Sequence, residues 1–233
     1  MKPSERDVSF RYLGYIIGMN LLCIGINLNI RSDLGVAAFS TLPYALSQVF
    51  TGLTFGEMNV IIYILLVSLQ FLIERHLSLP LLAEIPFSFV FGLLVDFYGL
   101  ILPAVDFSLS LRIPVLLAGN TLSGIGVFLM VRGQLVVAPV DGIVASVSKV
   151  YCHPYSICKN CFDLSMLSIT VIFCLLWHTP FYGIGLGTIF SAFYVGRVIR
   201  LCERYVHHDS PQGFPIPDTQ RKNLPGNDAG QVF

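Results

Sequence analysis

The uncharged run IPVLLAGNTLSGIGVFLMV, from Ile113 to Val131, decides the fold. Its 19 residues include no Asp, Glu, Lys or Arg, and a helix needs about 20 apolar residues to cross the hydrocarbon core of a bilayer. A second uncharged run of 33 residues, from Leu164 to Gly196, is interrupted near His178, Thr179 and Pro180. The chain therefore contains membrane-spanning segments.

The composition of the whole chain agrees with these runs. Of its 233 residues, 55% are hydrophobic and only 12% are charged, which is about half the charge of a soluble domain. The mean hydropathy is +0.74. Fourteen basic residues balance fourteen acidic ones, so no net field attracts nucleic acid. These values exclude a soluble globular protein and a nucleic-acid-binding protein.

The same criterion, a run of about 20 mainly apolar residues, predicts six crossings. Lipid cannot satisfy backbone amides, and none of these segments alternates like a barrel strand, so we expect an all-α, polytopic helix bundle whose partner is the lipid bilayer. The predicted spans are Phe10 to Ile30, Phe55 to Ile73, Leu77 to Leu102, Ile113 to Val131, Cys161 to Trp177 and Phe181 to Ile199.

The domain organisation is a single transmembrane domain, 10–204, between two cytoplasmic segments. Residues 1–9 form a short N-terminal segment, and residues 205–233 are polar, with four Pro and three Gly, which predicts a disordered tail. With six crossings, twelve basic residues are cytoplasmic and only Arg31 and Arg112 are outside. If 35–50 and 136–151 also crossed, the split would be eleven to three, and both termini would still be cytoplasmic.

The sequence contains an internal repeat. A shift of 101 positions matches 12 identical residues in the 42 positions from Gly18 to Asn59, which relates repeat one (10–102) to repeat two (112–200). Each repeat also has a short amphipathic or re-entrant helix, within 35–50 and within 136–151. Three crossings per repeat is an odd number, so the second repeat runs through the membrane upside down relative to the first. If the short segments also crossed, each repeat would have four crossings and the repeats would be parallel. The repeat has two interpretations. It either forms a functional site between its halves, or it is a duplication that only built a stable helix bundle.

Several motifs resemble a known family. They are Leu34-Gly35, LPYALS at 42–47, IPFS at 85–88 with FGLLVD at 91–96, and APVDGI at 138–143. From about Arg11 to Arg200 the chain is similar to the YczE/YyaS/YitT group of bacterial integral membrane proteins. The resemblance implies a multi-pass protein of the bacterial inner (plasma) membrane, with no established substrate.

Asp141 is the first candidate for a polar site. It follows Pro139 closely, in the first turn of a predicted helix, where a carboxylate meets unpaired amides. Its repeat partner, Ser40, offers a smaller oxygen. The two readings are structural capping and a cation or proton site beside a broken helix.

The other candidates are two acids and two amides. Glu84 and Asp96 belong to a polar stripe along the third predicted span, and acids inside spans often mark a pathway, although both positions fit the membrane interface equally well. Asn59 and Asn160 are matched by the repeat, and bonds between helices are the alternative role for their amides. We therefore place Asp141, Ser40, Asn59, Asn160, Glu84 and Asp96 along a substrate or ion path.

No motif predicts catalysis or a cofactor. Cys152, His153, Cys158 and Cys161 are zinc-binding types, but their spacing is irregular, so we expect no metal site. The sequence has no Walker loop, H-E-x-x-H, G-x-S-x-G or dinucleotide fingerprint. We expect no enzyme and no cofactor.

The repeats and their short segments favour a small transporter or permease-like protein for a small molecule or an ion. The alternative is a non-transporting membrane partner or regulator of an envelope or enzyme complex, which acts through its helix faces and its tail. Either protein could form a homo-oligomer.

Overall fold

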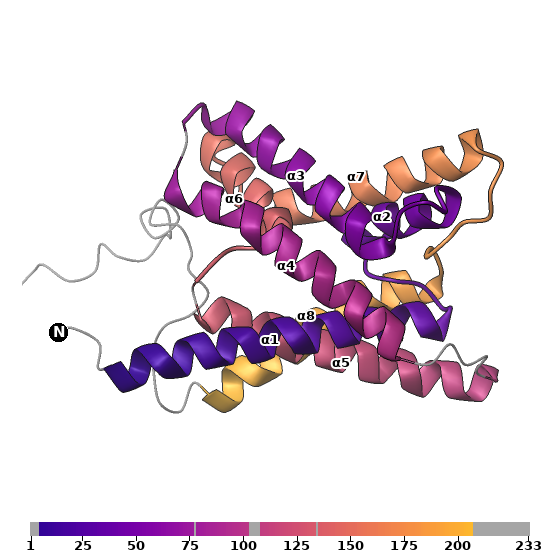
Figure 1. Ribbon diagram of the computed structural model, residues 1–233, viewed down its shortest axis with the longest axis horizontal. Helices are drawn as coiled ribbons and strands as arrows, with labels where there is room; N and C mark the ends of the chain where they lie inside the picture. Colours follow the sequence, from indigo (N-terminus) through magenta and orange to yellow (C-terminus); the bar gives the residue numbers. More distant parts are fainter. Residues whose placement is uncertain (1–4, 77, 103–107, 134, 207–233) are drawn as a thin grey trace, which may run out of the picture.

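The computed structural model describes residues 5–76, 78–102, 108–133 and 135–206, and these residues form eight α-helices (Figure 1). This confirms the predicted all-helical membrane bundle. The helices are α1 (Glu5–Ser32), α2 (Ala38–Val49), α3 (Phe55–Glu74), α4 (Leu79–Ile101), α5 (Leu109–Gly133), α6 (Pro139–Tyr151), α7 (Tyr155–Leu176) and α8 (Leu186–Val206).

Five of these helices, α1, α3, α4, α5 and α7, are long and apolar enough to cross a membrane. The short helices α2 and α6 have 12 and 13 residues. At about 1.5 Å per residue they are about 18 to 20 Å long, too short for a hydrocarbon core of about 30 Å.

The last helix differs most from its prediction. The sixth crossing was expected from Phe181, but α8 begins only at Leu186, because Gly183 has a φ of +71° and interrupts the helical path. The C-terminal half of α8 contains Arg197, Arg200 and Arg204. By length and composition α8 is not among the candidate spans, so a sixth crossing stays a prediction.

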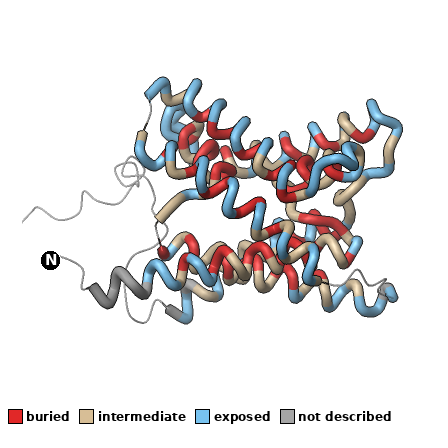
Figure 2. The backbone as a smooth tube through the Cα atoms, in the orientation of Figure 1, coloured by how far each residue is buried: buried red, intermediate tan, exposed pale blue. Residues whose placement is uncertain are grey.

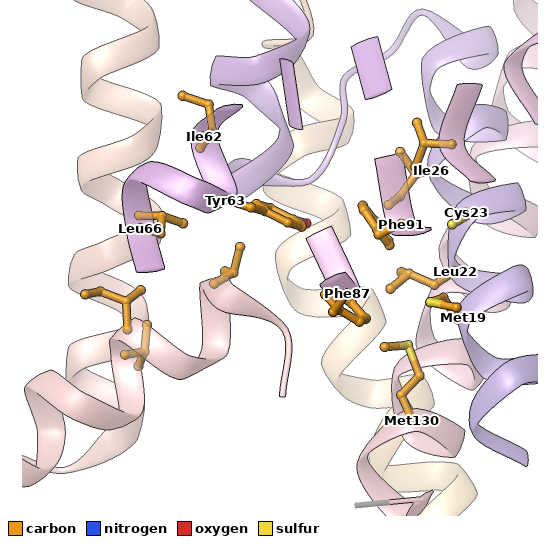
Figure 3. Close-up of a cluster of buried hydrophobic side chains, with 14 of the residues drawn as sticks. Met19, Leu22, Cys23, Ile26, Ile62, Tyr63, Leu66, Phe87, Phe91 and Met130 are labelled. Carbon is orange, nitrogen blue, oxygen red and sulfur yellow. The ribbon is translucent and has the colours of Figure 1, made fainter. Parts of the chain in front are cut away.

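The described helices lie in two layers. In Figure 1, α1, α5 and α8 form the lower layer, α2, α3, α6 and α7 form the upper layer, and α4 crosses diagonally between them. The buried residues in Figure 2 follow the helix faces that meet within and between these layers. At the centre, Tyr63 stacks on Phe91 with ring centroids 5.5 Å apart, and Phe87 stacks on Phe91 at 5.7 Å (Figure 3).

The backbones of α1 and α5 touch at two glycine pairs. A Cβ atom on Gly18 would lie 2.7 Å from the carbonyl oxygen of Gly126, and one on Gly25 would lie 2.5 Å from that of Gly119. Because the earlier glycine of α1 meets the later glycine of α5, the two helices are antiparallel. Small residues at such a contact allow close backbone approach in membranes.

The two halves of the chain pack in matching ways. α1 contacts α4 as α5 contacts α8, α2 contacts α3 as α6 contacts α7, and α3 contacts α6 as α2 contacts α7. One contact has no comparable counterpart within the described helices: α3 packs on α4 through Gly56 and Gly92, whereas α7 and α8 make at most marginal contact.

The glycine contact makes a prediction about stability. Gly25→Ala should destabilise the protein, because the new methyl group would collide with the backbone of α5. Gly14→Ala, on the same helix, is the matched control, since a Cβ there has no neighbour within 4 Å among the described residues. Thermal melting in detergent measures both. Equal melting temperatures for the two variants would contradict the contact.

Candidate functional site

The short helix α6 carries the centre of the candidate site. Pro139 starts this helix, and Asp141 lies in its first turn. The N-cap residue, Ala138, makes no side-chain hydrogen bond to the helix amides. One face of α6 packs on α3 and the other on α7, so its first turn meets polar residues from both.

On the α7 side, Lys159 lies between two carboxylates. Its Nζ atom is 3.3 Å from Oδ1 of Asp141 and 3.6 Å from Oδ1 of Asp163. The Tyr155 hydroxyl donates a hydrogen bond of 3.1 Å to Asp141. The Lys159 side chain is 26% exposed, so this charged group is largely shielded from solvent. Asp141 is therefore part of a charged cluster, not a simple helix cap.

Aromatic rings surround the same ammonium group. The ring centroids of Phe39 and Phe162 lie 5.6 and 5.7 Å from Nζ of Lys159, within the range of cation–π attraction. Phe39 belongs to the first turn of α2. The starts of the two short helices, α2 and α6, thus meet at Lys159, which they contact through Phe39 and Asp141.

On the side that faces α3 and α4, α6 meets a buried amide, Gln70 of α3, and a buried acid, Glu84 of α4. Glu84 is 2% exposed and Gln70 is 5% exposed. Nε2 of Gln70 donates a long hydrogen bond of 3.4 Å to Oε1 of Glu84. Within the described part of the chain, Oε2 of Glu84 and Oε1 of Gln70 have no hydrogen-bond partner. Both side chains occupy the space beside Gly142, where a Cβ atom would lie 2.8 Å from Oε1 of Gln70.

One turn further along α3 and α6 lies a second polar contact. The Ser146 hydroxyl donates a hydrogen bond of 2.6 Å to Oε1 of Glu74. The other oxygen of Glu74 is 3.8 Å from Nδ1 of His76, whose side chain is 60% exposed. Polar side chains of α3 thus face α6 on two successive turns, at Gln70 and at Glu74.

The other predicted residues lie in different surroundings. Asp96 accepts hydrogen bonds from the Thr54 hydroxyl (2.5 Å) and the Gly56 amide (2.7 Å), so it holds the start of α3. Asn59 is buried and donates to a carbonyl of its own helix, 2.8 Å away. Asn160 is exposed. Ser40 is buried, and its hydroxyl has no partner among the described atoms. Of the six predicted residues, only Asp141 and Glu84 thus lie at the polar contacts of α6 with its neighbouring helices.

Sequence reasoning missed Lys159, Asp163 and Gln70. Lys159 and Asp163 are four residues apart, the spacing of an ion pair on one helix face, and this signal could have identified them. Gln70 has no comparable signal, because a single amide in an apolar run does not reveal its partner.

The cysteines do not gather into a metal centre. Cys158 is buried, whereas Cys152 and Cys161 are exposed. The described residues contain no group of three His, Cys, Asp or Glu side chains that could hold a metal ion.

Apolar spanning helices around a buried polar centre define the class of this molecule: it is an integral, multi-pass helical membrane protein. The particular family follows from comparison with known proteins. Residues 9–204 match the model of a family of unknown function, DUF6198, and the chain belongs to that family.

Two relatives come from Bacillus subtilis (strain 168). The chain is 28% identical over 197 residues to the uncharacterized membrane protein YczE, covering 84% of this chain and 86% of the relative. It is also 28% identical over 133 residues to the uncharacterized protein YyaS, covering 56% of this chain and 65% of the relative. No solved structure matches the chain.

The charged cluster makes a second prediction about stability. Lys159→Met should cost about 1 to 2 kcal/mol, because it leaves two partly exposed carboxylates without their cation; a fully buried pair would cost roughly 3 to 5 kcal/mol. Lys149→Met is the matched control, since Lys149 is exposed on α6. Thermal melting compares the variants. Adding Asp163→Asn should recover part of the loss, and failure of that rescue would count against the cluster.

Proposed function

We propose that this protein is a small transporter or permease-like protein for a polar or ionic solute, and not an enzyme. Its substrate site is the charged cluster where the first turns of α2 and α6 meet. The observation that carries this proposal is the group Asp141, Lys159 and Asp163, which is shielded by Phe39 and Phe162. Charged groups inside the bilayer are costly and commonly mark a substrate or ion pathway.

The proposed architecture is two inverted repeats. The antiparallel glycine contact of α1 with α5 supports it, because a shift of 101 exchanges the two glycine pairs: Gly18 corresponds to Gly119, and Gly25 to Gly126. The matching helix contacts of the two halves also support it. Inverted repeats with short helices at corresponding positions are typical of secondary transporters, whose substrates bind at the repeat interface.

The short helices favour a solute site at this interface. The start of a helix carries a partial positive charge and unpaired amides. The amides of Ser40, Asp141 and Gly142 donate to the backbone carbonyls of Ala37 and Ala138. No side chain caps α2 or α6, so no side-chain cap neutralises these positive helix ends. Together with Lys159 they suit a negative group of the solute, whereas Asp141 and Asp163 suit a positive one. A zwitterion, or an anion and a cation bound together, fits this mixture of charges best.

Transport is tested with the full chain reconstituted in liposomes. Uptake of radiolabelled inorganic ions, amino acids, sugars and short peptides is measured in turn, because a zwitterion carries no net current. A solute that the wild type takes up should lose about tenfold in apparent affinity with Asp141→Asn, equivalent to about 1.4 kcal/mol. Asn160→Ala is the control, because Asn160 is exposed and outside the cluster. The absence of uptake of any solute would favour the non-transporting partner instead.

The proposed orientation places both termini in the cytoplasm of a bacterium and the protein in its inner membrane, following the excess of Lys and Arg. Alkaline phosphatase, which becomes active only after export, measures this. A fusion after Val206 should be inactive, and a fusion after Leu102, between α4 and α5, should be active. Activity after Val206 alone would mean that the topology is inverted. Activity at both sites would place the end of α8 outside the cytoplasm and contradict an even number of crossings from a cytoplasmic N-terminus.

A further inference from the structure

The buried pair of Gln70 and Glu84, beside Gly142 of α6, carries an inference of its own. We infer that Glu84 and Gln70 form a buried proton-binding site, in which a neutral Glu84 carboxylic acid donates a hydrogen bond to the Gln70 amide oxygen. This site is separate from the charged cluster, and proton binding there does not require that the protein transports a solute.

The hydrogen bonds carry the first step of the argument. The Gln70 amide already donates from Nε2 to one Glu84 oxygen, and the two remaining oxygens, Oε2 of Glu84 and Oε1 of Gln70, have no partner in the described structure. Two acceptors cannot satisfy each other. One proton on Oε2 turns an acceptor into a donor, and the carboxyl and carboxamide groups then form a ring of two hydrogen bonds. A single added proton therefore satisfies both orphaned atoms.

Burial and neighbouring charge favour the same state. An ionised carboxylate without a partner is too costly to bury, so such groups are paired or neutralised. The acidic side chains on the neighbouring helices are Glu74, from α3, and Asp141, from α6, whose charge is partly offset by Lys159. The polar side chains of α1 reach α4 near the C-terminal end of α4, away from Glu84. There Asn27 and Arg31 donate hydrogen bonds to backbone carbonyl groups of α4. Glu84 thus has acidic neighbours on the two helices that contact it.

The other half of the chain gives an internal comparison. The shift of 101 residues pairs Gly142 with Thr41, and the contact of α3 with α6 corresponds to that of α2 with α7. There the buried contact is made by two neutral hydroxyls, Thr41 and Thr170, 3.0 Å apart. Packing of this kind therefore needs no ionisable group. A carboxyl in one half alone indicates a role in chemistry and not in packing.

Polar groups extend from the level of Glu84 toward the end of α3. Gln70 and Glu74 lie one turn apart on α3, opposite Gly142 and Ser146, which lie one turn apart on α6. Beyond them the exposed imidazole of His76 approaches Glu74. The inferred entry of protons to Glu84 is from this end of α3.

Infrared spectroscopy of the full chain in lipid vesicles tests the site directly. A protonated carboxylic acid has a carbonyl band that is separate from the carboxylate bands and shifts in D₂O. The wild type should show this band at neutral pH, and Glu84→Gln should lose it. Glu57→Gln is the control, because Glu57 is an exposed acid on α3. The measurement is independent of flux, so the proton site and the transport proposal can fail separately.

Two further arms keep the result decisive if Glu84→Gln folds poorly. Gln70→Leu should keep the band but shift its frequency, because the acid loses its hydrogen-bond partner. Sodium chloride added at constant pH should leave the band unchanged, compared with choline chloride. A wild type without the band, a band that persists in Glu84→Gln, or a band removed by sodium would each overturn the inference.

Discussion

The antiparallel contact of α1 with α5 is the interaction on which the rest of the structure depends. It brings two backbones close enough for glycine carbonyls to meet the opposite helix, and no side chain larger than hydrogen fits at Gly25. In lipid there is little hydrophobic force between helices, so close packing supplies most of the attraction. Each of the two helices then anchors one more helix of its own half, α4 on α1 and α8 on α5.

Two sequence signals predicted most of the fold. Long apolar runs locate α1, α3, α4 and α5 to within a few residues, because crossing the bilayer demands a minimum apolar length. The amphipathic stripes located α2 and α6. The start of α7 was placed six residues late, at Cys161, because Lys159 was assigned to a loop, although its ion pair with Asp163 allows it inside the helix.

The candidate site was predicted less completely than the fold. Asp141 was identified from its place after Pro139, a local signal. Its cation comes from another helix, and no local pattern reports such a partner. Asp96 has the same difficulty: its spacing along α4 suggests a polar stripe, but its hydrogen bonds go to the start of α3. A sequence reveals which side chains are polar in lipid, but only tertiary structure reveals which group neutralises each one.

The separation of the two glycine pairs along the chain also has a consequence for biosynthesis. Gly25 of α1 meets Gly119 of α5, about 90 residues later. At roughly 5 to 20 residues per second, the ribosome needs on the order of 5 to 20 s to make the second partner. During that time the glycine face of α1 is open to lipid and to other nascent helices. Helix α1 is therefore made before α5, its principal partner, exists. The order of synthesis, and not only the final packing, decides which helix α1 meets first.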